Sequence, residues 1–223
     1  SEDVNLVKYL WTGYDIHGYW ADRVLKEYPG YSDYLIREFS LNGDDSKAIR
    51  KTARQEAKNK WVFPQFFGSS HKSCARDLNI PVNIAEDLAK EFWDEFKGVK
   101  RWQDKLIQNY EKKLYVETLT GRRRRRAMTK NELINMPIQG TAADIVTAAM
   151  NALSERSVME GNEDLHPNLN VHDDLSFIIP NENLPKVLPI ISEEMCRHRF
   201  DFINVPLLVE ASSGQRWNGL KED

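Results

Sequence analysis

Residues 169–179 read Leu-Asn-Val-His-Asp-Asp-Leu-Ser-Phe-Ile-Ile. Apolar side chains alternate with other residues on both sides of a polar centre, His172-Asp173-Asp174. Such alternation is typical of strands that bury one face. The stretch therefore predicts a β-hairpin with an acidic tip.

Helices are expected on both sides of this hairpin. Residues 46–65 are mostly good helix formers and follow a turn at 42–45 whose side chains can cap a helix. A second helix should begin after Pro81, with Asn83 as its N-cap, and continue towards Tyr110. Further expected elements are a helix over 130–156, a helix over 185–199 and a strand over 205–209. Helices followed by a small antiparallel sheet indicate an α+β fold.

The composition is that of a globular chain. Of the 223 residues, 41% are hydrophobic and 29% are charged, which is enough apolar material to bury a core. The sequence has no run of 18 apolar residues and does not start with a secretory signal, so neither a membrane span nor export is expected. Cys74 and Cys196 lie far apart, which argues against a disulfide scaffold or a cysteine zinc site and fits a reducing compartment.

Charge is unevenly distributed along the chain. The formal net charge of −3 argues against a uniformly basic surface for nucleic acid. Residues 122–126, however, are five consecutive arginines, while acidic residues gather elsewhere. A contact with a phosphate backbone, a solvated turn and a localisation signal are the three interpretations of this run, the last being unexpected within a domain.

Arg54 and Lys58 are the first candidates for a binding site. Residues four apart on a helix project from one face, so the two cations converge and suit a phosphate chain. Aromatic residues follow at once, in the segment 61–68, and nucleic-acid bases stack on aromatic faces. A solvated helix face followed by core phenylalanines is the plainer interpretation of the same residues.

Two further pairs of polar residues could act on a nucleotide. Asp173 and Asp174 offer hard oxygen ligands of the kind that Mg²⁺ prefers, although an Asp-Asp turn is also ordinary hairpin chemistry. Asn135 and Gln139 place two amides on one helix face, where each can donate and accept hydrogen bonds to base edges and sugars.

Taken together, six segments resemble the C-terminal part of a family-A DNA polymerase, and they occur in the order found in that family. The segments are 15–17 (D-I-H), 54–68 (the fingers helix called motif B), 115–123 (Y-V-E-T-L-T-G-R-R), 135–144 (N-M-P-I-Q-G-T-A-A-D), 171–174 (V-H-D-D, motif C) and 206–210 (P-L-L-V-E, the closing strand). The resemblance implies a right-hand polymerase fold, with a fingers subdomain over residues 1–112 and a palm portion over residues 113–223.

The resemblance also implies roles at the incoming nucleotide. His17, Arg54 and Lys58 would hold the triphosphate of a deoxynucleotide, and Lys58 would donate a proton to the leaving pyrophosphate. Phe63 would stack against the base or sugar. Phe67 stands where the family usually has Tyr, beside the templating base.

Other matching residues would contact the primer-template. Asn135, Gln139 and His172 would touch the primer terminus and the minor groove, where acceptor positions are shared by all base pairs. Arg122 and Arg123 would contact the phosphate backbone.

The acidic hairpin would form part of a metal site. Asp173 would be a carboxylate of a two-metal site, in which one Mg²⁺ activates the primer 3′-hydroxyl and both stabilise the displacement at the α-phosphate. Asp174, expected to act as the second ligand, stands where Glu is usual and is one methylene shorter.

Two further departures from the family pattern lie in different subdomains. In the fingers, Lys58 and Phe67 are nine residues apart rather than the usual eight, which leaves the stacking role open between Val62 and Phe63. In the palm portion, Asn131 stands where an Arg is common, four residues before Asn135. The unusual motif B favours a bacteriophage source.

The sequence contains no counterpart of the family's motif A, a strand that carries an Asp and the residues D-Y-S-Q-I-E. The expectation is a polymerase split between two chains in the cytoplasm of a bacterium or a bacteriophage host. A partner chain would supply motif A and the thumb, and it could also carry a 3′-5′ exonuclease domain. A single-subunit RNA polymerase fragment and a catalytically silent DNA-binding subunit are the alternatives, and the segment 139–144 with Asp174 favours the DNA enzyme over the RNA enzyme.

Overall fold

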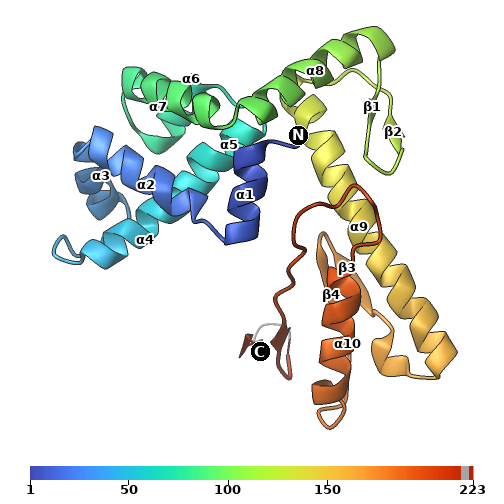
Figure 1. Cartoon of the computed structure of the whole chain (residues 1–223). Coiled ribbons are helices and arrows are strands. Elements are labelled where there is room, and N and C mark those ends of the chain that lie inside the picture. Colours follow the sequence, from blue (N-terminus) through green and yellow to red (C-terminus); the bar gives the residue numbers. More distant parts are fainter. Residues whose placement is uncertain (217–220, 223) are drawn as a thin grey trace. The chain divides into compact units, whose positions relative to one another are not determined.

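The computed structural model describes residues 1–216 and 221–222, and it is built of helices with a few short strands (Figure 1). The chain divides into two compact units. Unit 1 contains Ser1–Val116 and Arg123–Met136, and unit 2 contains Glu117–Arg122 and Pro137–Asp223. Each unit is described below by itself.

Unit 1 is almost entirely helical. Its elements are α1 (Val4–Thr12), α2 (Ile16–Glu27), α3 (Gly30–Glu38), α4 (Ser46–Ala57), a π-helical turn (Lys58–Val62), α5 (Phe63–Phe66), α6 (His71–Leu78), α7 (Val82–Glu95), α8 (Lys97–Lys113) and the first residues of α9 (Lys130–Glu160). The short strand β2 (Arg123–Arg124) also belongs to unit 1, and the short strand β1 (Val116–Glu117) lies at the division between the two units.

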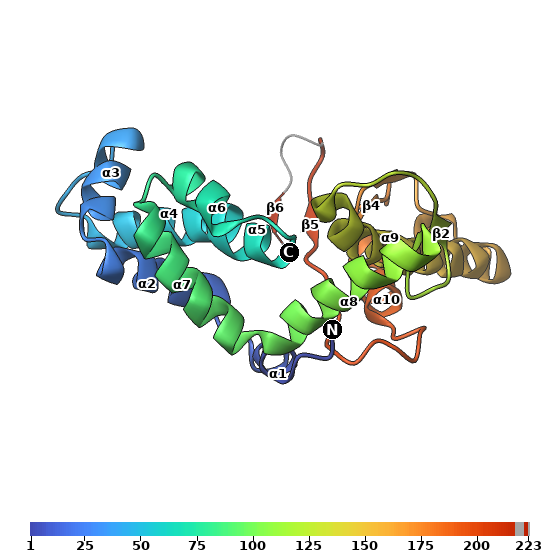
Figure 2. The ribbon, with the colours of Figure 1, turned by 90° about the horizontal axis from the view of Figure 1, so that it is seen from above.

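Aromatic side chains fill the core of unit 1. Trp20 of α2, Trp61 of the π turn and Phe92 of α7 are each at most 2% exposed, and the Trp20 and Phe92 ring centroids lie 5.1 Å apart. Burying one such side chain contributes about 1.5–3 kcal/mol. This core fixes α2 alongside α4, an arrangement that Figures 1 and 2 both show.

The helix predicted over 46–65 is confirmed. Asp45 caps α4 by accepting a hydrogen bond from the Ala48 amide at 2.9 Å. Helical structure then continues through the π turn into α5 as far as Phe66. The π turn itself was not predicted, because an i→i+5 hydrogen bond leaves no mark on the hydrophobic pattern.

The prediction for residues 81–110 is wrong in two respects. Pro81, not Asn83, occupies the N-cap position of α7. The helix also breaks at Phe96, and α8 starts at a clear angle to α7 in Figure 2. The buried carboxylate of Asp3 explains the break, because it accepts hydrogen bonds from the amides of Gly98 at 2.6 Å and Val99 at 3.3 Å and so caps a new helix.

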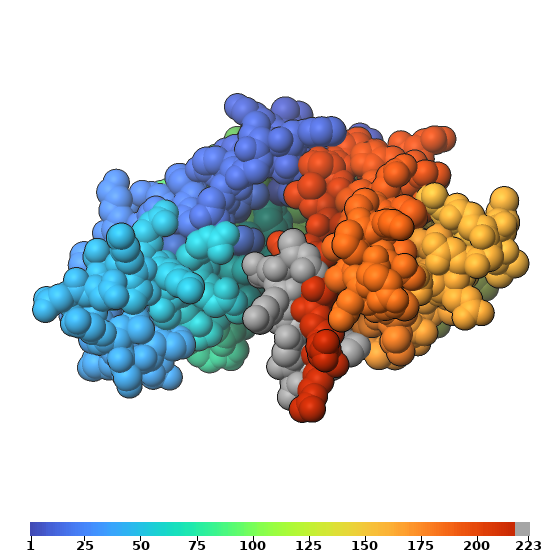
Figure 3. Space-filling view, turned by 90° about the horizontal axis from the view of Figure 1, so that it is seen from below, coloured from blue at the N-terminus to red at the C-terminus, as the bar shows by residue number. Residues whose placement is uncertain are grey.

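Unit 2 packs a small hairpin and two helices around its own core. Its elements are the rest of α9, a 3₁₀ turn (Glu163–Leu165), β3 (Leu169–Val171), β4 (Asp174–Ser176), α10 (Leu184–Cys196), β5 (Ser212–Ser213) and β6 (Lys221–Glu222). The core consists of Leu153, Leu165, Leu175, Val187 and Ile191. Figure 3 shows the yellow residues of α9 and the orange residues of this unit side by side.

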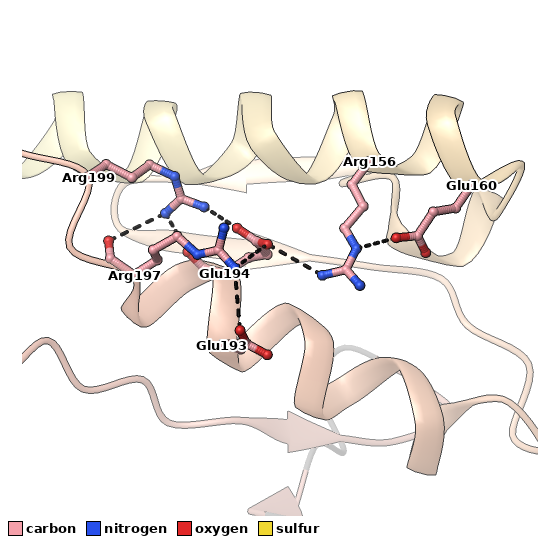
Figure 4. Close-up of polar contacts among 6 residues, drawn as sticks. All are labelled: Arg156, Glu160, Glu193, Glu194, Arg197 and Arg199. Atoms are coloured by element: carbon pink, nitrogen blue, oxygen red, sulfur yellow. Dashed lines mark hydrogen bonds and ion pairs between the residues drawn. The ribbon is translucent and has the colours of Figure 1, made fainter.

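Ion pairs reinforce the packing of α10 on α9. The carboxylate of Glu194 is only 6% exposed and accepts contacts from Arg156 of α9 at 3.4 Å and from Arg197 at 3.2 Å (Figure 4). Arg199 also pairs with it, and Figure 4 shows the three guanidinium groups converging on this carboxylate. Breaking such a buried pair on one side is costly, so these arginines are structural.

The hairpin prediction is confirmed, whereas other predictions in unit 2 need correction. β3 and β4 pair antiparallel, with Leu169 opposite Ser176 and Val171 opposite Asp174. The strand predicted over 205–209 does not form, because in the described part of the chain no strand lies beside it to take up its hydrogen bonds. The two helices predicted over 130–156 and 185–199 form over 130–160 and 184–196.

None of the helices in the described ranges is both long enough and apolar enough to cross a membrane.

Candidate functional site

Four predicted nucleotide-binding residues come together in unit 1, where the start of α2 meets the end of α4. Arg54 lies in the last turn of α4, and Lys58 opens the π turn one helical turn later. His17 lies in the first turn of α2. Phe63, the first residue of α5, contacts both His17 and Lys58, as described below. α2 packs on α4, so the core brings these residues together.

An ion pair links the two helices at this point. The Arg54 Nε donates to Asp15 Oδ1 at 3.1 Å and to Oδ2 at 2.9 Å. Asp15 is also the N-cap of α2 and accepts from the Gly18 amide at 3.0 Å. The hydrogen bond from Arg54 holds the pKa of the Asp15 carboxyl below its usual value, so Asp15 is ionised at neutral pH.

His17 lies within this arrangement as a neutral imidazole. Its pKa is lowered, first by burial and then by the positive charges of Arg54 and Lys58. Its Nδ1 is buried and has no hydrogen-bond partner within the described residues. The ring meets that of Phe63 edge to face, with centroids 5.3 Å apart. His17 is therefore a hydrogen-bonding group in a cationic environment.

Of the two candidates for stacking, only Phe63 presents a ring to solvent. Phe63 is 40% exposed, whereas Val62 is 1% exposed and belongs to the core. The Lys58 Nζ lies 5.6 Å from the Phe63 ring centroid, and the Phe67 ring lies 6.1 Å from it. The cation, the exposed ring and the second phenylalanine thus form one continuous surface.

The π turn explains the nine-residue spacing between Lys58 and Phe67. The Phe63 amide donates to the Lys58 carbonyl, an i→i+5 hydrogen bond that encloses one residue more than an α-helical bond does. The extra residue is absorbed without ending the helix. Phe63 therefore reaches the surface while Trp61 and Val62 stay buried.

Gly68 fixes the end of this surface against the first turns of α9. Its φ of +91° lies in the region that favours glycine, and a Cβ added there would lie 2.6 Å from Ile134 Cδ1 and 3.3 Å from Asn131 Oδ1. The backbone at residue 68 can lie this close to Ile134 and Asn131 only because glycine has no side chain. The preceding residue, Phe67, is thereby held next to Phe63.

The acidic hairpin lies in unit 2. His172 adopts a φ of +60° in the turn, and Asp174 begins β4 opposite Val171. Asp173 and Asp174 are both exposed. Their carboxylates fit Mg²⁺ in ligand chemistry, but the described residues contain no group of three or more His, Cys, Asp or Glu that could hold a metal ion.

The five arginines 122–126 are exposed, and several of them make specific contacts. In unit 2, Arg122 Nη2 lies 3.0 Å from Asp144 Oδ1 and 3.0 Å from the Gly140 carbonyl oxygen. In unit 1, Arg123 and Arg125 lie over the Tyr115 ring, at 4.9 and 5.6 Å from its centroid. The backbone amide of Leu119 donates to Thr141 Oγ1 at 3.0 Å and ties this segment to α9 beside Gln139.

The predicted residues are divided between the two units. Unit 1 contains His17, Arg54, Lys58, Phe63, Phe67, Arg123 and Asn135. Unit 2 contains Arg122, Gln139, His172, Asp173 and Asp174. Asn135 is half-buried and Gln139 is exposed, and both lie on α9 on either side of the Met136–Pro137 division. Sequence reasoning missed Asp15 as a member of the site, although its place three residues before Gly18 is a capping signal.

The sequence is similar to known proteins along most of its length. The family model for DNA polymerase family A matches residues 1–219. DNA polymerase I of Chloroflexus aurantiacus is 31% identical over 98% of this chain and 22% of its own length. DNA polymerase I of Geobacillus stearothermophilus is 30% identical over 99% of this chain and 24% of its own length. The chain thus spans about a quarter of the length of these relatives.

A solved structure shows the same fold. It is described as the POL domain of Pol1 from M. smegmatis in complex with DNA primer-template and dNTP. The TM-score is 0.71 at 24% identity, over 92% of this chain and 35% of the other. The predicted α+β fold of the polymerase fingers and palm is confirmed. By its sequence along nearly its whole length and by its fold, the chain belongs to DNA polymerase family A.

Proposed function

We propose that this chain supplies the deoxynucleotide site and part of the metal site for template-directed DNA synthesis, in which deoxynucleotides are added to a primer 3′ end. The observation that carries the proposal is the meeting of His17, Arg54, Lys58 and the exposed Phe63 ring in unit 1. Two cations, a neutral imidazole and an exposed aromatic face are what a nucleoside triphosphate needs.

Each of these residues has a distinct part in holding the nucleotide. Arg54 offers a planar fork for phosphate oxygens, whereas Lys58 acts as a compact point charge. Lys58 is the proposed proton donor to the departing pyrophosphate, because its ammonium group is the positioned acid of the site. His17, neutral at pH 7, donates one hydrogen bond to the phosphate chain without adding charge.

Phe63 is proposed to stack against the base or sugar, and Phe67 to lie beside the templating base. A base that stacks on an exposed ring gains about 1–3 kcal/mol. Such stacking depends little on which base is present. The choice of base is therefore left to pairing with the template.

Asp173 and Asp174 are the residues that would hold Mg²⁺, and the proposal is a site for two ions. Bound there, Mg²⁺ would make the primer 3′-hydroxyl a stronger nucleophile and neutralise charge at the α-phosphate. Asp173, in the turn, keeps its carboxylate exposed. Asp174 begins β4, so its backbone is fixed by pairing with Val171.

Primer-template DNA is the proposed partner of a second group of residues. Arg122 and Arg123 would contact backbone phosphates, while Asn135, Gln139 and His172 would contact the primer terminus and the minor groove. The support is the exposure of Gln139 and His172 and the way Arg122 is tied to the Gly140 carbonyl, next to Gln139. These contacts would be independent of DNA sequence, as a replicating enzyme requires.

Activity is proposed to need further polypeptide with another metal-binding carboxylate besides Asp173 and Asp174, of the kind that motif A carries in the family. The same chain or a separate one could provide it, together with the thumb. Support comes from the number of ligands, because the two adjacent carboxylates of the hairpin cannot by themselves surround two Mg²⁺ ions. A bacteriophage source stays a prediction from the nine-residue spacing in the fingers helix.

Primer extension tests this proposal. The chain is assayed with a primed template, Mg²⁺ and the four deoxynucleotides, alone and co-expressed with the polypeptide encoded next to it. Extension by the combined preparation, and its loss with Asp173→Ala, is the expected result. If both preparations bind DNA tightly but neither extends the primer, the chain is a silent DNA-binding subunit instead.

A further inference from the structure

The ion pair between Asp15 and Arg54 involves only one nitrogen of the guanidinium group. Both hydrogen bonds of this pair are made by the Arg54 Nε, at 3.1 and 2.9 Å. The terminal nitrogens Nη1 and Nη2 take no part in the pair. The Asp15 carboxylate therefore binds the Nε of the guanidinium group and leaves the two terminal nitrogens available to another anion.

Asp15 is itself held in place. Its Oδ1 accepts the Gly18 amide at 3.0 Å, which makes Asp15 the N-cap of α2. A Cβ at Gly18 would overlap the Asp15 carboxyl group, so only glycine leaves room for it there. A carboxylate anchored to a helix start is a fixed point from which a long arginine side chain can be oriented.

A second pair between the same two helices serves as a comparison. Arg50, one turn before Arg54 on α4, contacts Asp22 of α2 through both Nε and Nη2, at 2.9 and 2.8 Å. That pair uses one terminal nitrogen of the guanidinium and has no predicted site residue beside it. The positive charge of Arg54, in contrast, already acts on His17 by lowering its pKa.

We propose that Asp15 is a positioning residue that orients Arg54 so that its terminal nitrogens bind the polyphosphate of a nucleoside triphosphate. The inference rests on the proposed function of the same site. Fixing a flexible cation before the ligand arrives reduces the entropy lost on binding. Asp15 would thus strengthen the binding of an anion although it is itself negatively charged.

The test compares Asp15→Asn with Asp22→Asn in the full chain. Asn is as good an N-cap as Asp, so Asp15→Asn keeps the start of α2 and removes only the ionic contact with Arg54. Asp22→Asn removes the same charge from the same helix. Binding of dATP and of deoxyadenosine is measured by titration, and thermal melting monitors the fold of each variant.

The expected result is dATP binding at least about 5-fold weaker with Asp15→Asn than with Asp22→Asn, with deoxyadenosine binding equal in the two. In an Arg54→Gln background, Asp15→Asn should have no further effect on dATP binding. A merely structural role for Asp15 would weaken the binding of both ligands together. Asp15→Ser, which keeps a capping oxygen but is too short for Arg54, should reproduce Asp15→Asn.

Two results would overturn the inference in different ways. If the unchanged protein binds dATP but Asp15→Asn equals or exceeds Asp22→Asn in affinity, Asp15 does not position Arg54 and the proposed function stands. If the unchanged protein binds no dATP, the proposed function fails and this inference fails with it.

Discussion

The rings of His17 and Phe63 meet edge to face with their centroids 5.3 Å apart, although the two residues come from different helices. The Lys58 Nζ also lies near the Phe63 ring, 5.6 Å from its centroid. The arrangement depends on the π turn, which brings Phe63 to the surface one residue later than an α-helix would. A spacing that departs from the family pattern is thus accommodated at the place where the nucleotide is expected.

Replacing Phe63 or its neighbour with alanine should separate binding from stability. Phe63→Ala removes an exposed ring, so dNTP affinity should fall about 5- to 100-fold with little change in thermal stability. Val62→Ala removes buried methyl groups, so the free energy of unfolding should fall by about 1–3 kcal/mol. Nucleotide titration and thermal melting of both variants check this. The reverse pattern would assign the stacking role to Val62.

Much of the surface formed by Arg54, Lys58 and Phe63 could be predicted from the sequence, because it depends on local features. The four-residue spacing of Arg54 and Lys58, and the aromatic residues that follow, lie on one continuous helical segment. The π turn could not be predicted, since one extra residue could equally have ended the helix. The exposure of Phe63 follows from that turn and was left undecided for the same reason.

Contacts between distant parts of the chain could not be predicted at all. Asp3 caps α8 at Gly98, 95 residues away, and only the folded chain shows why the helix predicted from Pro81 breaks at Phe96. The strand expected over 205–209 has a suitable composition, but a strand also needs a partner. The β3–β4 hairpin could be predicted because both of its strands lie in one short stretch of sequence.

Gly68→Ala should destabilise the protein for two additive reasons. The positive φ disfavours any side chain, and the new Cβ would lie 2.6 Å from Ile134 Cδ1. Together these should lower the free energy of unfolding by about 2–4 kcal/mol. Gly121→Ala is the matched control, because its φ is +92° but nothing lies within 4 Å, so it should cost only about 1 kcal/mol. Equal losses would show that the Ile134 side chain moves aside at little cost and that the clash does not contribute.

The ionisation of His17 should depend on its two cationic neighbours. Its pKa is lowered by burial, by Arg54 and by Lys58, so NMR titration of the imidazole should give a value below 6.5. Lys58→Gln should raise that value without restoring 6.5. In the unfolded chain the group binds its proton more readily, so His17 contributes stability above its unfolded pKa and loses it as pH falls below about 6.5. A measured pKa of His17 above 6.5 would contradict its burial beside Arg54 and Lys58.

Asp173→Asn should separate nucleotide addition from DNA binding. The change keeps the shape of the side chain and removes a charge that a metal ion requires, so addition should fall more than about 100-fold. Primer-template affinity should stay the same or rise, because a negative charge near DNA is lost. Asp201→Asn removes the same charge from another exposed position of unit 2 and should leave both properties unchanged. Loss of DNA binding with Asp173→Asn would indicate a folding defect.

The proposal that the surface formed by His17, Arg54, Lys58 and Phe63 holds the triphosphate of a deoxynucleotide is tested by equilibrium binding of dATP. Binding is measured for the unchanged protein, for Lys58→Gln and for Lys60→Gln. The two variants lose the same charge from the same π turn, but Lys60 pairs with Glu56 whereas Lys58 lies beside Phe63. The affinity for dATP should be about 10- to 100-fold weaker with Lys58→Gln and nearly unchanged with Lys60→Gln. Equal effects of the two substitutions, or no binding by the unchanged protein, would contradict the proposal.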